Sequence, residues 1–145
     1  MKNITSSDNK ITTLIATGDG IYEIKKGKAE LIINGSSPAF SILQSKFHEN
    51  IIYIGLYDGL VVATYENGRW KFIGKLHNIS GRIYSVDEDN EGNIWFIVRY
   101  NGVYKAKISN PLSLRVDETE VFVNLPFSPK FDEDARVKYI YGSIK

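Results

Sequence analysis

Ile52-Tyr-Ile-Gly-Leu-Tyr-Asp-Gly59-Leu-Val-Val-Ala63 is the stretch that decides the fold. It consists of an apolar strand, a short turn that ends in glycine, and a second apolar strand. The same phrase occurs earlier as Leu14-Ile-Ala-Thr-Gly-Asp-Gly20-Ile-Tyr-Glu-Ile24 and later as Ile94-Trp-Phe-Ile-Val-Arg-Tyr-Asn-Gly102-Val-Tyr-Lys-Ala106. The turn glycines lie 39 and 43 residues apart. A period of about 40–45 residues with several strands per unit is typical of β-propeller blades.

Strand patterns also dominate the rest of the chain. No window shows a sustained helical stripe of apolar residues, whereas short β-branched and aromatic runs are bounded by Gly, Asn, Asp and Pro. Turn signals such as Glu66-Asn-Gly68 supply the positive-φ residues that hairpins need. The sequence predicts strands near 12–16, 21–24, 29–33, 39–43, 51–55, 60–65, 70–74, 83–87, 94–98, 103–108, 119–124 and 137–141.

These strands predict an all-β fold of about three to three and a half four-stranded antiparallel propeller blades. Residues 1–10 are expected to be a flexible lead-in, and 11–145 a single partial propeller domain. Its parts are a first blade over 11–34 that lacks its innermost strand, blades over 39–76 and 82–124, and the start of a further blade over 125–145. Because the end blades need neighbours, we expect an incomplete propeller or fragment that further blades or a homo-oligomer completes.

Composition excludes some classes of partner. The net charge is +1 over 145 residues, which gives no electrostatic reason to expect binding to nucleic acid or direct contact with a membrane. The chain has no cysteine, so it contains no disulfide and no thiolate to bind a metal or attack a substrate.

The third unit resembles the two-component regulator propeller repeat, through Gly92-Asn-Ile-Trp95 and Gly102-Val-Tyr104. The second unit keeps Tyr53-Ile-Gly55 and Gly59-Leu60, and the first keeps Gly20-Ile-Tyr22. Phe96 to Arg99 depart from the usual Ile-Gly-Thr of that family. The resemblance implies the periplasmic or extracellular sensor propeller of a bacterial hybrid histidine kinase, often one that responds to carbohydrate breakdown products.

No catalytic residue, cofactor site or metal site is predicted. Asp87-Glu-Asp-Asn-Glu-Gly92-Asn-Ile94 mimics the start of a calcium loop, but Val98 stands where the bidentate glutamate should be and no helix flanks the loop. A charged hairpin tip explains the same residues. His48 and His77 belong to no recognisable catalytic or metal-binding spacing.

A ligand-binding face is predicted from the order of the strands. Successive connections in a blade alternate between its two ends, so the glycine turns share one end with the loops that join the blades. That end combines exposed aromatic rings with polar and charged groups, a mixture suited to stacking on a sugar ring and binding its hydroxyls. The candidate residues are Asp19, Tyr57, Asp58, Arg82, Arg99, Tyr100 and Asn101. The alternative is that these turns are polar and aromatic by chance.

Two tryptophans are assigned different places. Trp95 occupies the same position as Tyr53 and Leu14 in the second strand of its unit, and we expect all three to pack between blades. Trp70 lies in an outer strand and is a candidate for partial exposure.

The sequence therefore predicts a non-catalytic module that binds a small molecule or an oligosaccharide. The first alternative is a propeller that serves as a scaffold for protein–protein interaction. The second is a propeller-fold lyase, since Gly92-Asn-Ile-Trp-Phe96 is also similar to the streptogramin lyase repeat.

Overall fold

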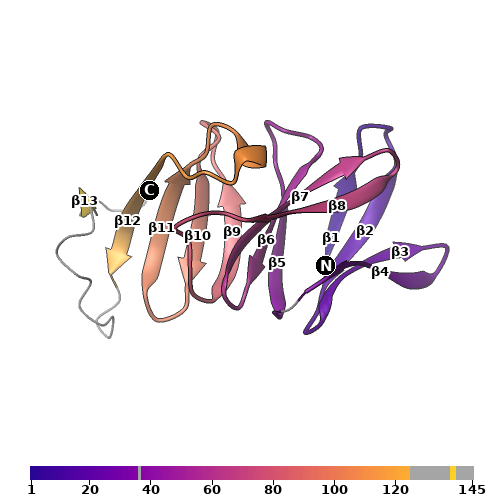
Figure 1. Ribbon diagram of the computed structural model, residues 1–145, viewed down its shortest axis with the longest axis horizontal. Coiled ribbons are helices and arrows are strands. Elements are labelled where there is room, and N and C mark those ends of the chain that lie inside the picture. Colours follow the sequence, from indigo (N-terminus) through magenta and orange to yellow (C-terminus); the bar gives the residue numbers. More distant parts are fainter. Residues whose placement is uncertain (36, 125–137, 140–145) are drawn as a thin grey trace.

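The computed structural model describes residues 1–35, 37–124 and 138–139. Over these residues the chain forms three sheets that lie side by side in the order of the sequence (Figure 1). Sheet 1 contains β1 (Lys2–Thr5), β2 (Ile11–Ala16), β3 (Gly20–Lys25) and β4 (Lys28–Asn34). Sheet 2 contains β5 (Ala39–Gln44), β6 (Ile51–Leu56), β7 (Gly59–Glu66) and β8 (Arg69–Lys75). Sheet 3 contains β9 (Ile83–Glu88), β10 (Ile94–Val98), β11 (Gly102–Lys107) and β12 (Glu118–Asn124).

In each sheet these four strands form an antiparallel meander in which every strand pairs with the next strand of the chain. The predicted all-β fold of propeller-like, four-stranded antiparallel blades is thereby confirmed. The three sheets do not close into a ring (Figure 1). One short 3₁₀ helix, η1 (Pro111–Ser113), interrupts the connection between β11 and β12.

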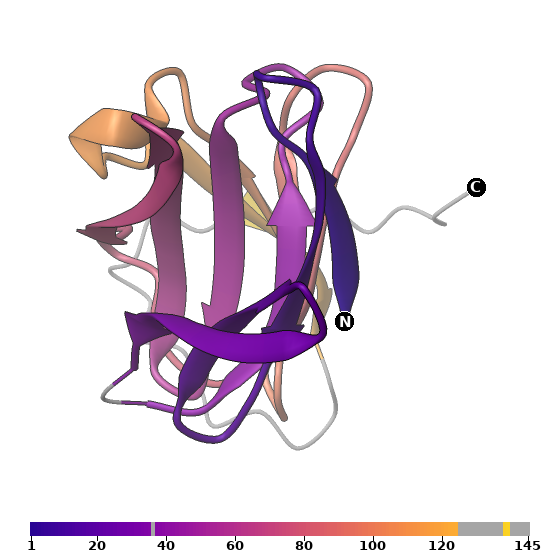
Figure 2. The ribbon, with the colours of Figure 1, turned by 90° about the vertical axis from the view of Figure 1, so that its right-hand side faces the viewer.

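Both ends of the chain differ from the sequence prediction. Residues 1–10 were expected to be a flexible lead-in, but β1 pairs with β2 over the register Lys2↔Leu14 to Thr5↔Ile11. Sheet 1 therefore has the innermost strand that the sequence pattern did not predict. Ile4 explains the pairing, because its side chain is fully buried in the core. Figure 2 shows β1 at the edge of the sheet nearest the viewer.

The predicted further blade over 125–145 lies mostly outside the described residues. The part that is described, β13 (Lys138–Tyr139), pairs in parallel with β12 and so joins the outer edge of sheet 3. It does not form the inner strand of another sheet.

Two apolar cores fill the spaces between the sheets. Side chains alternate between the faces of a strand, so each strand of the middle sheet contributes to both cores. In β6, Ile52 and Ile54 belong to the core shared with sheet 1, whereas Ile51 and Tyr53 belong to the core shared with sheet 3. Among the described residues, sheet 2 is therefore covered by a sheet on both faces, and sheets 1 and 3 are each covered on one; we call the other face of sheets 1 and 3 uncovered.

The repeated phrase places equivalent residues on equivalent faces. Leu14 is fully buried in the core between sheets 1 and 2, and Tyr53 is 1% exposed in the core between sheets 2 and 3. These two side chains pack between blades, as predicted. Trp95 differs from this expectation, because it is half-buried on the face of sheet 3 that no other sheet of the described residues covers.

Trp70 is buried rather than partly exposed. Its ring belongs to the core between sheets 1 and 2 and lies 5.2 Å, centroid to centroid, from the ring of Tyr65. Trp70 is therefore a packing residue, and the expectation of partial exposure is wrong.

Candidate functional site

Two arginines and four aromatic residues gather at one end of sheets 2 and 3. We call them the arginine–aromatic cluster: Phe40, Tyr57, Arg82, Tyr84, Arg99 and Tyr100. The Arg82 guanidinium carbon lies 4.0 Å from the centroid of the Tyr57 ring, within the range of a cation–π contact. The Arg99 guanidinium carbon lies 4.4 Å from the Tyr100 ring centroid and 5.7 Å from that of Tyr84.

The inner strands supply the other aromatic rings of the cluster. Phe40 of β5 and Tyr84 of β9 pack at 5.0 Å between ring centroids, which links sheet 2 to sheet 3 at their inner edges. Arg82 also donates a hydrogen bond from its guanidinium to the Tyr84 hydroxyl at 3.3 Å. The cluster therefore continues from one sheet to the next without a break.

Two β-bulges place these inner-strand rings. In sheet 2, Ala39 pairs with Leu56 and Ser41 pairs with Gly55, so Phe40 is the extra residue. In sheet 3, Ile83 pairs with Val98 and Ser85 pairs with Ile97, so Tyr84 is the extra residue. A bulge redirects the side chain that it carries. Phe40 and Tyr84 are accordingly 38% and 40% exposed although both lie within strands.

Backbone hydrogen bonds hold the turns of the cluster against the inner strands. Arg99 N–H donates to the Arg82 carbonyl at 2.9 Å, and Tyr57 N–H donates to the Pro38 carbonyl at 2.9 Å. Each glycine turn is thus tied to the start of the inner strand of its own sheet. The aromatic rings stand on a fixed backbone, which reduces the conformational entropy that the protein would lose when a ligand binds.

The cluster carries positive charge that no carboxylate of the described residues neutralises. In the part of the chain that the structure describes, neither Arg82 nor Arg99 forms an ion pair with an acidic side chain. The hydrogen bond from Arg82 lowers the pKa of Tyr84, and the charge of Arg99 acts in the same direction. An anion would therefore meet two unpaired guanidinium groups.

Tyr100 adopts a backbone conformation that is unusual for an aromatic residue. Its φ is +64°, in the left-handed region that favours glycine and asparagine. The three-residue turn between β10 and β11 imposes it, and the ring stands 62% exposed beside Arg99. Strained positions of this kind gather at functional sites.

The structure brings together four of the seven candidates named from the sequence: Tyr57, Arg82, Arg99 and Tyr100. Asp58 lies beside Tyr57, but its carboxylate forms an ion pair with Lys75. Asp19 belongs to the corresponding turn of sheet 1, where it accepts hydrogen bonds from Thr17 Oγ1 at 2.6 Å and from the Tyr22 hydroxyl at 2.8 Å. Both carboxylates are thus held by internal partners.

Those partners shift the titration of the two aspartates. The Lys75 ammonium lowers the pKa of Asp58, and hydrogen bonds from Thr17 and then Tyr22 lower the pKa of Asp19. Asn101, the last candidate, lines a small hollow of about 130 Å³ beside Asn78, Ser80 and Tyr104.

Sequence reasoning missed Phe40 and Tyr84. A signal was present, because Ala39-Phe-Ser41 and Ile83-Tyr-Ser85 place an aromatic residue before a serine at the same point of successive inner strands. Strand alternation alone assigns these residues to an ordinary sheet face. Only the bulges bring both rings to the end of the sheets.

The calcium-like string forms a hairpin loop that its own hydrogen bonds explain. Asp89 accepts from the backbone N–H groups of Glu91 and Asn93, both at 2.9 Å, and from Trp95 Nε1 at 2.8 Å. Burial on its own would raise the pKa of Asp89, but these hydrogen bonds and those of the Asn93 side chain lower it to about 2. The carboxylate organises the loop between β9 and β10.

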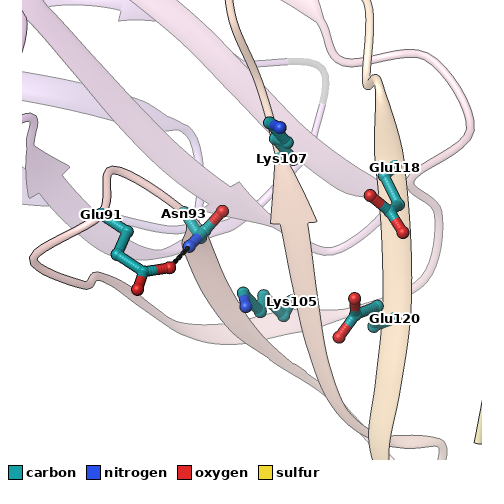
Figure 3. A pocket seen from close by; sticks show the side chains of 6 residues that line it. All are labelled: Glu91, Asn93, Lys105, Lys107, Glu118 and Glu120. Atoms are coloured by element: carbon teal, nitrogen blue, oxygen red, sulfur yellow. Dashed lines mark hydrogen bonds between the residues drawn. The ribbon is translucent and has the colours of Figure 1, made fainter.

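A second hollow of about 280 Å³ lies on the uncovered face of sheet 3 (Figure 3). Lys105 and Lys107 come from β11, Glu118 and Glu120 from the paired strand β12, and Glu91 and Asn93 from the β9–β10 loop. The lining of this hollow therefore places lysine ammonium groups next to glutamate carboxylates. This hollow has no aromatic lining and is separate from the arginine–aromatic cluster.

Comparison with known proteins gives no match to a family model, to a curated protein or to a solved structure. Among residues 1–35, 37–124 and 138–139, no three His, Cys, Asp or Glu side chains are placed to hold a metal ion. The same residues contain no helix of the length and apolarity that crossing a membrane requires.

Proposed function

We propose that this chain is a non-catalytic ligand-binding module and that the arginine–aromatic cluster is its binding site. The observation that carries the proposal is the combination of two guanidinium groups, which have no carboxylate partner within the described part of the chain, and four exposed rings at one end of two sheets. Guanidinium groups bind carboxylates in a fork geometry, and exposed aromatic faces stack on sugar rings.

The ligand that fits this chemistry is a small molecule that carries both a ring and a negative charge. An oligosaccharide that contains sugar acids meets both conditions. Neutral sugars would use only the rings and the hydrogen-bonding groups, so we expect them to bind more weakly. The resemblance of Gly92-Asn-Ile-Trp95 and Gly102-Val-Tyr104 to the two-component regulator propeller repeat supports a sensing role in the periplasm or outside the cell.

Calorimetric titration with two matched sugars tests the proposal. Trigalacturonic acid and neutral galactotriose have similar size and differ in the carboxylates. We expect measurable binding of the acid, weaker binding of the neutral sugar, and a loss of affinity for the acid as salt is raised. The variants Arg82→Gln and Arg99→Gln should each weaken binding of the acid at least tenfold.

Arg69→Gln is the matched control, because Arg69 is exposed at the start of β8 and belongs to no contact of the cluster. Its affinity should equal that of the wild type. Absence of binding by both sugars, or an equal loss in the Arg69 variant, would contradict the proposal.

Docking of a protein segment is the second candidate function. Arginine and tyrosine carry much of the binding energy at protein interfaces, and Tyr57 and Tyr100 are 48% and 62% exposed. A peptide-display selection against the wild type and against the Arg99→Gln, Tyr100→Ala double variant separates the two functions. Peptides that bind only the wild type, together with no response to sugars, would favour the scaffold.

A further inference from the structure

The residue that follows each turn glycine shows that sheet 3 has an uncovered packing face. Ile21 is 1% exposed in the core between sheets 1 and 2, and Leu60 is fully buried in the core between sheets 2 and 3. Val103 is the third residue of this series, and it is only half-buried. It differs from the other two because no sheet follows sheet 3 in the described chain.

Other apolar side chains share that face with Val103. Ile97 alternates along β10 with Phe96 and Val98, which point into the core with sheet 2, so Ile97 points away from that core. It is 42% exposed. The ring of Trp95 packs on Phe122 at 4.6 Å between centroids. Together these side chains form an apolar patch, and the charged residues of Figure 3 lie beside it.

Sheet 1 has the matching uncovered face. Leu14 and Ile21 point into the core with sheet 2, so the alternating residues Ile15, Tyr22 and Ile24 lie on the opposite face. Their equivalents in the next two sheets are buried against the preceding sheet. Those equivalents are Ile54 and Phe96 for Ile15, Val61 and Tyr104 for Tyr22, and Ala63 and Ala106 for Ile24.

The central residues of the two faces differ in size from their equivalents at the junctions within the chain. On sheet 3, Trp95 stands where the earlier sheets have the smaller Leu14 and Tyr53. On sheet 1, Thr13 stands where the later sheets have the larger isoleucines Ile52 and Ile94. Ile24, which pairs with Thr13, stands where the later sheets have the smaller Ala63 and Ala106, so the face of sheet 1 keeps its apolar bulk at this pair.

We propose that the uncovered face of sheet 3 in one copy of the chain packs on the uncovered face of sheet 1 in a second copy. The junction repeats the arrangement by which sheet 1 meets sheet 2 and sheet 2 meets sheet 3. It buries Val103, Ile97 and Trp95 against Ile15, Tyr22 and Ile24. Lys105, Lys107, Glu118 and Glu120 form the polar part of the contact, as at the rim of protein interfaces.

Twofold symmetry makes two such junctions from two copies. A head-to-tail contact of this kind gives a closed ring when the rotation closes. Three sheets from each copy make a ring of six, within the range of about four to eight blades that propellers use. Rotation about the ring axis leaves the arginine–aromatic clusters of the two copies at the same end.

Two single substitutions and their mixture test the proposal. Sedimentation equilibrium of the wild type should give a dimer at micromolar concentration. Ile97→Glu places a carboxylate on the sheet 3 face, and Ile15→Glu places one on the sheet 1 face. Each variant alone should sediment as a monomer, because every possible junction then contains one altered face.

Mixing the two variants should restore association. The intact sheet 1 face of the Ile97→Glu chain can meet the intact sheet 3 face of the Ile15→Glu chain, so an open dimer with one junction should form. Contacts between identical faces would not show this behaviour. Circular dichroism of each variant verifies that it is folded, and the restored dimer is a second sign of folded partners.

Leu112→Glu is the control, since Leu112 is 51% exposed in η1 and is not among the residues of either face. This variant should remain a dimer. A wild type that stays monomeric up to about 100 μM, or a mixture that stays monomeric while both variants are folded, would overturn the proposal. Either result would indicate that further blades of a longer chain cover these faces.

Discussion

Tyr100 combines a backbone that costs energy with a side chain that stands in solvent. A non-glycine residue in the left-handed region loses about 1–2 kcal/mol relative to its preferred conformations, and the φ of Tyr100 is +64°. Its ring contributes to no apolar core but lies 4.4 Å from the Arg99 guanidinium carbon. The energetic cost is therefore understandable if the ring serves in binding.

Replacing Tyr100 by glycine should separate stability from binding. Glycine relieves the left-handed strain, although its more flexible unfolded chain offsets part of the gain. We expect the free energy of unfolding of Tyr100→Gly to rise by zero to about 1 kcal/mol, while the affinity for the acidic oligosaccharide falls. Urea unfolding and calorimetric titration measure the two effects. A variant that keeps its affinity would show that the ring takes no part in binding.

Asp89 makes the stability of the β9–β10 loop depend on pH. Its folded pKa is about 2, below the unfolded value of 3.8, so the carboxylate stabilises the fold above the unfolded pKa. This contribution is lost as the pH falls from about 5 through 2. We expect the Asp89 carboxylate to contribute about 1–2 kcal/mol to the free energy of unfolding near neutral pH. This value is the free energy that corresponds to the lowered pKa, reduced because the carboxylate is partly exposed to solvent.

Asp89→Asn should lose that contribution at pH 7 and show a shallower decrease of stability between pH 5 and pH 2. Urea unfolding at a series of pH values checks both expectations. Glu91→Gln is the control, because Glu91 is an exposed acid of the same loop. An Asp89→Asn variant with the stability and acid sensitivity of the wild type would contradict the assignment.

At the scale of elements, Gly55 sets the distance between sheets 2 and 3. A Cβ atom built there would lie 2.4 Å from Ser41 Oγ and 2.7 Å from the carbonyl oxygen of Ile83, which is the first residue of β9. Contacts this short force a strand to move. Because β9 is the inner strand of the next sheet, the shift would disturb the packing of both sheets.

We therefore expect Gly55→Ala to reduce the free energy of unfolding by about 2–4 kcal/mol. Gly18→Ala is a matched control, since a Cβ at Gly18 meets no atom within 4 Å. Its effect should stay within about 0.5 kcal/mol. Denaturant midpoints of the two variants measure the difference, and equal midpoints would mean that the sheets adjust to the added methyl group.

The strands that could be predicted from the sequence are those whose apolar residues and turns agree. Gly59 and Gly68 bound β7, and every strand residue between Gly59 and Thr64 is buried, so local pattern and packing indicate the same element. β1 could not be predicted, because Ile4 is the one apolar residue among its four. Its pairing depends on a core that forms only when sheet 2 is present.

The candidate site was predictable to the extent that it lies in turns. Tyr57, Arg99 and Tyr100 follow directly from the repeated phrase, because their position before the turn glycine fixes the end of the sheet on which they lie. Phe40 and Tyr84 depend on bulges, which arise from the pairing of whole strands and leave no composition signal in one strand. The roles of Asp19 and Asp58 could not be predicted either, because they depend on the side chains that their carboxylates meet in the folded chain.

For the whole molecule, the position of a sheet in the row decides how much a repeated residue contributes to stability. Leu60 and Val103 both follow a turn glycine and face the next sheet position, but within the described residues only Leu60 has a sheet against it. Leu60→Ala should cost about 2–5 kcal/mol through lost burial and a cavity. Val103→Ala should cost less than about 1 kcal/mol in a single copy, because its side chain is already half-exposed.

The stability cost of Val103→Ala should depend on protein concentration, whereas the cost of Leu60→Ala should not. If two copies join through sheets 3 and 1, Val103 becomes buried on association, and binding of a partner to the folded state stabilises that state by mass action. The thermal midpoint of the wild type should then rise with concentration, and the difference between the wild type and Val103→Ala should widen. Thermal unfolding from 1 to 100 μM measures this, and midpoints that are independent of concentration in both proteins would mean that Val103 faces solvent in solution.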